Sequence, residues 1–238
     1  LSNKNMTLAI IGLGSNLNKN NKSRFDNLKA AIKLIRKSNN IDVIKTSSVY
    51  LSDAQLPDNP PKNWDLDYLN LCLLIQTNLK PQDLLKDLKS IEKALGREQS
   101  KTWAPRVIDL DILLYSNFDN QFISKDLNIP HKHLFERPFA LLPAFEIIPE
   151  DMQSYFFSNK LNHVKSLIST WQEPNKAPFN TRKIPQKINS PYLMQIINAT
   201  PNSFSENNNL NNYQDIFKNI DQAISCGAHM IDIGAEAT

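Results

Sequence analysis

Two aspartates, Asp109 and Asp111, stand two residues apart in the apolar run Val107–Tyr115. A β-strand places residues two apart on the same face, so the run predicts two carboxylates that point the same way, with Cα atoms about 7 Å apart. At that separation two like charges repel by about 2–3 kcal/mol at an effective dielectric near 20. A divalent cation removes this repulsion, and Mg²⁺ is commonly held by carboxylates together with phosphate oxygens. The spacing alone leaves open that both carboxylates lie on a solvent-facing strand surface.

Several cationic side chains lie close to this pair in the sequence and favour a ligand that carries phosphate groups. They are Arg97, Arg106, Lys125, His131 and Arg137. A guanidinium presents a planar fork of donors that matches phosphate oxygens, and a lysine adds a point charge. Each cation taken alone is also compatible with a solvated surface charge, and His131 with a packed loop histidine. Beside a carboxylate pair, however, the cations together predict a polyphosphate site.

The glycine pattern excludes the common nucleotide-binding loops. The 238 residues include five glycines and no G-x-x-x-x-G-K-[ST] sequence, so a P-loop is excluded. The segment Gly12-Leu13-Gly14 begins a G-x-G, but the third glycine of a dinucleotide fingerprint is missing. If the protein binds a nucleotide, it therefore uses neither of these two glycine-rich loops.

The composition argues against nucleic acid or a membrane as a partner. The net charge of +3 is too small to indicate either, although it suits an anionic substrate in a local basic site. No apolar run approaches the ~20 residues of a membrane span, and the first residues lack the apolar core of a signal peptide. Cys72 and Cys226 lie in apolar contexts that suit buried thiols in a reducing compartment. A cytoplasmic location is expected.

The elements that must position these residues alternate in a recognisable order. Hydrophobic periodicity and turn residues predict four strands and two long helices before residue 116. The predicted strands are Thr7–Leu13, Ile41–Leu51, Tyr68–Thr77 and Val107–Tyr115, and the predicted helices begin at Ser23 and Pro81. Ser23 and Asp26 have the spacing of a capping box, and Gly96 suits the end of the second helix. The order β-α-β-β-α-β is the split βαβ of an α+β ferredoxin-like sandwich. The long segment between Ser52 and Asp67 is a loop of the length that is usually functional or disordered.

Composition divides the chain into two domains. Residues 1–171 form the first, and shorter helical segments follow its sandwich pattern. Residues 172–190 contain three prolines and many polar side chains, which indicates a linker. Residues 191–238 show a strand, a helix and a second strand, the β-α-β unit that opens a parallel α/β domain.

The segment Trp103–Leu114 (WAPRVIDLDILL) resembles the signature of the 6-hydroxymethyl-7,8-dihydropterin pyrophosphokinase family. Four further segments resemble motifs of that family in the same order. They are Gly12–Leu17, Asp67–Asn70, Ile129–His131 and Arg137–Pro143. The resemblance covers about two thirds of the chain. It implies an enzyme that transfers pyrophosphate from ATP to the dihydropterin and releases AMP, with two Mg²⁺ ions bound between the substrates.

The resemblance also implies roles for individual residues. The catalytic set is Arg97, Arg106, Asp109 and Asp111, of which the two aspartates bind metal. The ATP-binding set is Glu92, Trp103, Ile112, Leu127, Asn128, His131 and Arg137. The pterin-binding set is Asp53, Tyr68, Asn70 and Phe139. Without the resemblance, Tyr68 and Phe139 are compatible with core packing, and Glu92 with an exposed polar helix face that it shares with Lys89 and Lys93.

Two segments near the end of the chain resemble dihydropteroate synthase. Asn198–Ser205 is similar to its N-x-T-P-D-S-F motif, with Asn202 in place of the aspartate, and Met230–Thr238 to a second motif. The resemblance implies the start of a (β/α)₈ barrel in which Asn198 contacts metal and diphosphate. The chain is accordingly expected to be a piece of a bifunctional protein that also condenses the pterin diphosphate with p-aminobenzoate and forms a homodimer through the barrel.

Two other classes of function remain as alternatives. RNA-recognition domains share the ferredoxin-like sheet, but they need aromatic residues in a K/R-G-F/Y-type strand, which the sequence lacks. An inactive scaffold is compatible with the sequence, although the intact pair Asp109 and Asp111 argues against it. The loop Arg97–Trp103 is one residue shorter than the family pattern and carries Gln99 where a second arginine is common, so transition-state charge is expected to be shared differently.

Overall fold

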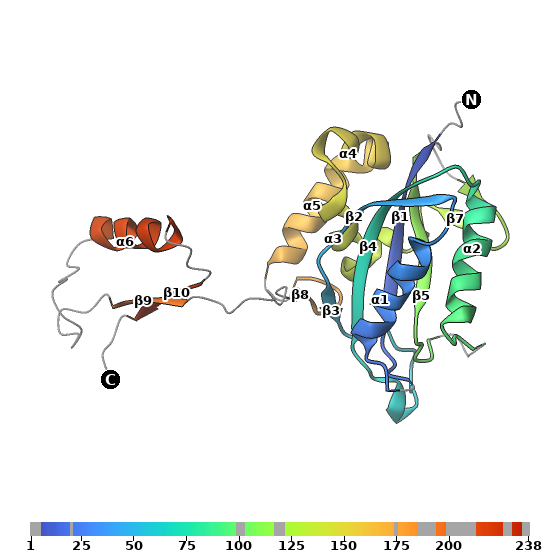
Figure 1. The fold of residues 1–238 in the computed structure, drawn as a ribbon, viewed down its shortest axis with the longest axis horizontal. Coiled ribbons are helices and arrows are strands. Elements are labelled where there is room, and N and C mark those ends of the chain that lie inside the picture. The colour runs from blue at the N-terminus through green and yellow to red at the C-terminus, as the bar shows by residue number, and fades with distance from the viewer. Residues whose placement is uncertain are drawn as a thin grey trace. The chain divides into compact units, whose positions relative to one another are not determined.

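A computed structural model describes residues 6–19, 21–98, 103–116, 122–173, 176–184, 194–198, 213–225 and 230–234 (Figure 1). The chain forms two compact units, Leu1–Pro185 and Gln186–Thr238. No helix in the described ranges is both long and apolar enough to span a membrane.

An antiparallel sheet forms the centre of the first unit (Figure 1). Its strands are β1 (Thr7–Ser15), β2 (Ile41–Thr46), β3 (Tyr50–Ser52), β4 (Tyr68–Thr77), β5 (Asp109–Tyr115) and β8 (Thr181–Lys183). The strand order is β5-β1-β4-β3-β8, and β2 also pairs with β4. Helices α1 (Arg24–Ile35) and α2 (Pro81–Ala94) connect the strands in the β-α-β-β-α-β order that the sequence predicts. The prediction of an α+β fold is confirmed for this unit.

The second predicted strand is divided into β2 and β3. At the break, Ser47 Oγ accepts a hydrogen bond from the Cys72 amide at 2.8 Å, and the Ser47 amide donates to the Cys72 carbonyl at 2.9 Å. The side chain of Ser47 thus takes the place of a backbone acceptor, and the chain enters β3 with a new register on β4. Periodicity alone does not reveal this interruption, because the residues on both sides favour strands.

The termini of the helices follow the predicted capping signals. Ser23 Oγ accepts from the Asp26 amide at 3.2 Å, and the Asp26 carboxylate accepts from the Ser23 amide at 3.1 Å, which completes a capping box. Pro81 occupies the first turn of α2, where its missing N–H is not needed. Gly96 follows the helix with a φ of +87°, a left-handed conformation that glycine adopts without strain.

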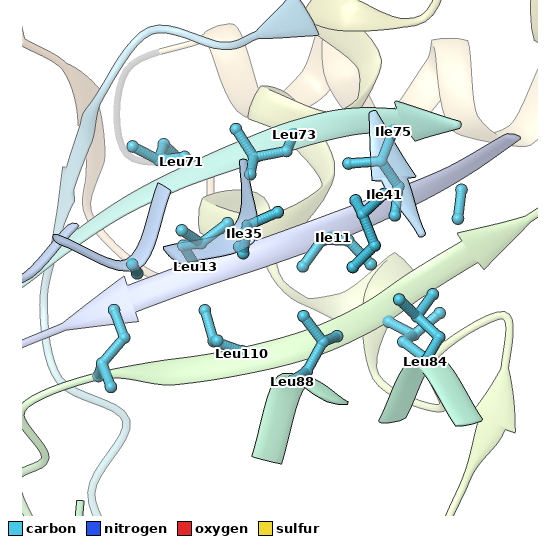
Figure 2. Packing of buried hydrophobic residues seen from close by; sticks show 14 of the residues in the cluster. Ile11, Leu13, Ile35, Ile41, Leu71, Leu73, Ile75, Leu84, Leu88 and Leu110 are labelled. Carbon is cyan, nitrogen blue, oxygen red and sulfur yellow. The ribbon is translucent and has the colours of Figure 1, made fainter. Parts of the chain in front are cut away.

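Apolar side chains cover both faces of the sheet. On one face, leucines and isoleucines of β1, β4 and β5 pack against α1 and α2, as Figure 2 shows for Ile11, Leu73 and Leu88. The opposite face packs against α3 (Pro138–Ile147), α4 (Glu150–Phe157) and α5 (Leu161–Gln172) through a second cluster that includes Leu74 and Leu141. Two short strands, β6 (Phe122–Ile123) and β7 (Asn128–Ile129), pair with each other. The 3-10 turns are η1 (Lys62–Trp64), η2 (Leu134–Glu136) and η3 (Ser158–Lys160).

The prediction of a linker over residues 172–190 is wrong for residues 181–183. Thr181–Lys183 forms β8, which pairs antiparallel with β3 and belongs to the first unit. These residues are polar, and backbone hydrogen bonds to the edge of β3 hold them in the sheet. A strand of this kind has no hydrophobic alternation from which a sequence could predict it.

The second unit contains a parallel pair of strands, β9 (Met194–Asn198) and β10 (Met230–Gly234), in a register that places Gly234 beside Asn198. Helix α6 (Tyr213–Ser225) lies between them in the chain. Parallel strands require such a crossover, so the predicted β-α-β unit is confirmed. The described residues of this unit show no further strand of a barrel.

Candidate active site

A cavity of about 280 Å³ opens on the sheet face that carries α3. Two glycines of β1 form part of its floor: Gly12 pairs with Asp111, and Gly14 pairs with Asp109 on one side and Asn70 on the other. A Cβ atom at Gly14 would lie 3.3 Å from Asn70 Oδ1, and one at Gly12 would lie 3.1 Å from the Leu113 side chain. The missing side chains therefore leave room between the aspartates of β5 and the polar groups of β4.

Ten of the residues that the sequence predicts for the site line this one cavity. The catalytic set contributes Arg106, Asp109 and Asp111. The ATP-binding set contributes Trp103, His131 and Arg137. The pterin-binding set contributes Asp53, Tyr68, Asn70 and Phe139. Residues that are up to 86 positions apart, from Asp53 to Phe139, thus meet where β1, β4 and β5 present one face.

The Asp109 carboxylate is held by two arginines. Oδ2 accepts a hydrogen bond from Arg106 Nη1 at 2.6 Å, and Oδ1 accepts from Arg97 Nη1. Burial raises the pKa of Asp109, but the positive charges of Arg106 and Arg97 outweigh it and hold the pKa below its usual value. Asp109 is therefore a carboxylate at neutral pH.

The Asp111 carboxylate is in a different electrostatic environment. Burial and then the negative charge of Asp109 raise its pKa, and Lys89, whose Nζ lies 3.9 Å from Asp111 Oδ1, opposes them without cancelling them. A nearby cation stabilises a carboxyl group whose pKa is raised, because the cation favours the charged form of that group.

Asp109 and Asp111 have the donor atoms that suit Mg²⁺. Both carboxylates reach the same cavity, and carboxylate oxygen is the ligand that Mg²⁺ prefers. Within the described ranges, no cluster of three or more His, Cys, Asp or Glu side chains could enclose a cation. A Mg²⁺ ion here would take its remaining ligands from water or from a phosphate-bearing substrate, which is its usual arrangement.

Glu92 is buried, so the alternative of an exposed polar helix face is wrong for this residue. Its Oε1 accepts hydrogen bonds from the Leu110 amide at 2.7 Å, from Lys89 Nζ at 2.8 Å and from Arg97. Lys89 Nζ also donates to the Leu110 carbonyl at 3.1 Å. Because β5 lies at the end of the sheet, this ion pair satisfies outward-facing backbone groups of Leu110. Burial raises the pKa of Glu92, against the effects of Lys89 and Arg97.

Four residues of the predicted ATP-binding set lie away from the cavity lining, and Glu92, described above, is one of them. Ile112 and Leu127 are buried in the cluster beneath α1 and α2, and Asn128 is half-buried in β7. Arg97 reaches the site through its bond to Asp109 rather than as part of the cavity wall. Residues 99–102, which include Gln99 of the shortened loop, lie outside the described residues.

His131 lines the cavity, and its assignment to the cations around the triphosphate stays a prediction. Burial lowers its pKa to about 4, with further contributions from Arg137 and His133, so the imidazole is neutral at pH 7. Arg137 is a better cation for this position. Its Nε is buried and has no hydrogen-bond partner in the part of the chain that the structure describes, which leaves a donor for a ligand.

The side chains on the pterin side of the cavity are held by neighbours. Asn70 Nδ2 donates to Ser52 Oγ at 2.9 Å, which fixes the orientation of the amide. The ring of Phe139 meets the ring of Phe179 edge-on, with 5.6 Å between centroids. The guanidinium of Arg137 lies 5.9 Å from the centroid of Phe139. Residues near the site that sequence reasoning missed include Ser52, Phe179 and Lys89.

Comparison with known proteins gives a consistent assignment. The sequence profile of the 7,8-dihydro-6-hydroxymethylpterin-pyrophosphokinase family matches residues 10–149, more than half of the chain. The chain belongs to this family. The matched range includes most of β1, all of β4 and β5, and the aspartate pair. A second profile, described as pterin binding enzyme, matches residues 194–238.

Relatives of this chain include folate synthesis bifunctional proteins. That of Chlamydia caviae is 31% identical and that of Arabidopsis thaliana 32%, and each alignment covers 96% of this chain and 49% of the relative. The chain thus spans about half the length of these relatives. The crystal structure of wild-type Plasmodium falciparum HPPK-DHPS with pteroate is similar in fold, with a TM-score of 0.54 and 17% identity over 98% of this chain and 57% of that one.

The second unit carries Asn198, the residue predicted to contact metal in the synthase part. Asn198 is the last residue of β9, and Gly234 ends β10 beside it. The rest of the two motifs, 199–205 and 235–238, lies outside the described residues. The predicted metal contact of Asn198 stays a prediction.

Proposed function

We propose that the first unit transfers pyrophosphate from ATP to 6-hydroxymethyl-7,8-dihydropterin, with AMP as the second product. The observation that carries the proposal is the position of Asp109 and Asp111, which share one cavity with Asn70 and Phe139. One half of the cavity has carboxylates and guanidinium groups that suit a metal-bound polyphosphate. The other half has an amide and an aromatic ring that suit a flat heterocycle.

The proposed reaction needs positioning more than covalent chemistry by the protein. The oxygen of the substrate's hydroxymethyl group attacks the β-phosphorus of ATP, and the bond from that phosphorus to the oxygen shared with the α-phosphorus breaks. The bonding electrons leave with AMP, and the hydroxyl proton passes to solvent or phosphate. Phosphoryl-type transfers depend chiefly on alignment and charge stabilisation, so no protein base is required.

The chain's own groups take distinct parts in this reaction. Asp109 and Asp111 would hold Mg²⁺, two ions per site, which when bound supplies a Lewis acid that neutralises charge on the phosphate oxygens. Arg106, Arg137 and Arg97 place positive charge where the triphosphate lies, and His131 offers a neutral imidazole. Asn70 hydrogen-bonds the amide edge of the pterin, and Phe139 stacks on its ring.

The remaining ATP contacts are carried over from the family resemblance. Glu92 would contribute to ATP binding from its position beneath β5, where it also accepts a hydrogen bond from Arg97. Trp103 lines the cavity and is placed to border the nucleotide. The adenine and ribose would be bordered by Ile112, Leu127 and Asn128. For this role their backbone atoms would have to make the contacts, or their side chains would have to move.

The second unit is proposed to begin a dihydropteroate synthase barrel in the whole protein. The β-α-β unit and the pterin binding enzyme match support this proposal. In that protein the pterin diphosphate would condense with p-aminobenzoate, with Asn198 near metal and diphosphate, and the barrel would form a homodimer. The buried free thiol of Cys72 suits a reducing, cytoplasmic location.

Identification of the products tests the proposed transfer. The protein is incubated with the dihydropterin, ATP and Mg²⁺, and phosphorus NMR follows the nucleotide. Equal amounts of AMP and a pterin diphosphate are expected. Formation of ADP with a pterin monophosphate, or hydrolysis of ATP that does not depend on the pterin, would contradict pyrophosphate transfer.

A further inference from the structure

The segment that follows α5 returns to the sheet beside the pterin half of the cavity. Strand β8 pairs antiparallel with β3, so that Thr181 lies opposite Ser52 and Lys183 opposite Tyr50. The Ile184 amide donates to the Val49 carbonyl at 2.8 Å, which extends the ladder. This segment therefore covers the otherwise open edge of β3.

Two hydrogen bonds connect this edge to side chains of the cavity. The Asp53 amide donates to the Asn180 carbonyl at 3.2 Å, and Asp53 itself lines the cavity. Ser52, which pairs with β8, accepts the hydrogen bond from the Asn70 side chain at 2.9 Å. The positions of Asp53 and Asn70 thus depend on a strand edge that β8 completes.

Phe179, just before β8, makes the most direct contact. Its ring meets Phe139 edge-on at 5.6 Å between centroids and 61° between planes, the geometry that aromatic pairs prefer. Phe139 stands at the beginning of α3, with one side toward the cavity. An edge-on neighbour limits the rotation of the Phe139 ring and keeps its face available to a flat ligand.

A charged contact joins β8 to the same helix. Lys183 Nζ lies 3.2 Å from Glu146 Oε1, and Glu146 belongs to α3. Glu146 also accepts hydrogen bonds from the Ser48 hydroxyl at 2.7 Å and from the Tyr50 hydroxyl at 2.8 Å. Strand β3, strand β8 and helix α3 are therefore joined through one carboxylate and form one wall.

We propose that Phe179–Lys183 is the outer wall of the pterin half of the site and that Phe179 is a positioning residue that holds the ring of Phe139. The inference rests on the proposed function, since it concerns how the same cavity receives the pterin. It also assigns a task to a stretch that otherwise looks like a connection between two domains.

Substitution of Phe179 in the full chain tests the proposal. Phe179→Ala should lower kcat/KM for the pterin about three- to tenfold, the range that corresponds to one lost aromatic pair. The Kd of a non-hydrolysable ATP analogue should stay within twofold of wild type. Phe179→Tyr keeps the ring and should restore kcat/KM.

Tyr155→Ala provides a matched control, because it removes an aromatic side chain that meets Phe156 edge-on on α4. It should leave kcat/KM for the pterin unchanged. An equal loss in Tyr155→Ala and Phe179→Ala would mean that general packing is responsible and would overturn the positioning role.

A double-mutant cycle with Phe139→Ala separates positioning from a direct contact. If Phe179 acts through Phe139, then Phe179→Ala should cause no further loss in the Phe139→Ala background. The same loss in both backgrounds would overturn the proposal. If wild type turns over the pterin and Phe179→Ala does so equally well, this inference alone fails; if wild type does not turn it over, the proposed function fails and the inference with it.

Discussion

Asp109 and Asp111 lie two residues apart on β5 and open onto the same cavity, yet their partners differ. The Asp109 carboxylate accepts hydrogen bonds from Arg97 and Arg106, whereas Asp111 forms a longer ion pair with Lys89, whose Nζ lies 3.9 Å from Oδ1. One aspartate is thus stabilised as an anion by the protein, and the other needs a cation from outside. This asymmetry predicts that the two aspartates respond differently to the same substitution.

Asp111→Asn should abolish turnover and, in the presence of EDTA, stabilise the protein. The pKa of Asp111 is raised by burial and by Asp109, so the folded state binds a proton more tightly than the unfolded chain. Stability is therefore lost as the pH rises from about 4 through the raised pKa. At pH 8 the free energy of unfolding of the variant should be about 1 kcal/mol higher than that of wild type, after allowance for solvent screening.

Denaturant unfolding of both proteins measures this difference. The gain should shrink toward pH 4, where Asp111 is protonated. Asp109→Asn is the matched control, and it should be less stable than wild type because Arg97 and Arg106 lose their partner. A loss of stability in Asp111→Asn at pH 8 would contradict the electrostatic account.

Arg106→Ala should reduce kcat/KM about 10²-fold or more, the scale for one lost charge-stabilising contact. Arg97→Ala should act mainly on kcat, because Arg97 hydrogen-bonds both Glu92 and Asp109 and so orders these carboxylates beside the site. Steady-state kinetics with varied ATP distinguish the two effects. A change in the KM for ATP alone would show that Arg97 serves binding only. Arg36→Ala, an exposed arginine after α1, should behave as wild type.

Phe139→Ala should weaken pterin binding far more than ATP binding, because a flat ring needs a stacking partner. Titration calorimetry of the pterin in the presence of an inert ATP analogue, and of the analogue alone, gives both affinities. We expect a loss of at least tenfold for the pterin, since truncation of a buried aromatic anchor commonly exceeds 1.4 kcal/mol. Equal losses for both ligands would make Phe139 a packing residue.

Glu146→Gln should destabilise the protein by about 1–2 kcal/mol at pH 7, the scale of hydrogen bonds to a charged group. Burial raises the pKa of Glu146, but hydrogen bonds from Ser48 and Tyr50 outweigh it and leave the pKa below its usual value. The stabilisation is present above about pH 4.3, the pKa of an unfolded glutamate, and is lost as the pH falls through the lower folded value. Thermal melts of both proteins from pH 7 to pH 3 should converge. A constant difference over this range would contradict the role of the charge.

The sequence predicted the features that local patterns determine. The alternation around Asp109 and Asp111 placed both on one strand face, and the spacing of Ser23 and Asp26 predicted the capping box. The five motifs contain most of the residues that line the site. Each motif lies at the end of a strand or at the start of a helix.

Features that depend on distant partners could not be predicted in this way. Glu92 is buried because its carboxylate satisfies the Leu110 amide, 18 residues away on an edge strand. Strand β8 exists because β3 offers a free edge. His131 is neutral because the fold buries it beside Arg137. None of these relationships leaves a periodic or compositional signal.

The release of AMP in the presence of the dihydropterin, ATP and Mg²⁺ tests the central claim most directly. It should be measured for wild type and for Asp111→Asn, which the electrostatic argument expects to fold at least as well. The account predicts pterin-dependent AMP release by wild type and a loss of at least 10²-fold in the variant, the scale of a removed charge-stabilising group. Wild-type rates in Asp111→Asn, or no pterin-dependent AMP from either protein, would contradict pyrophosphate transfer at this pair of aspartates.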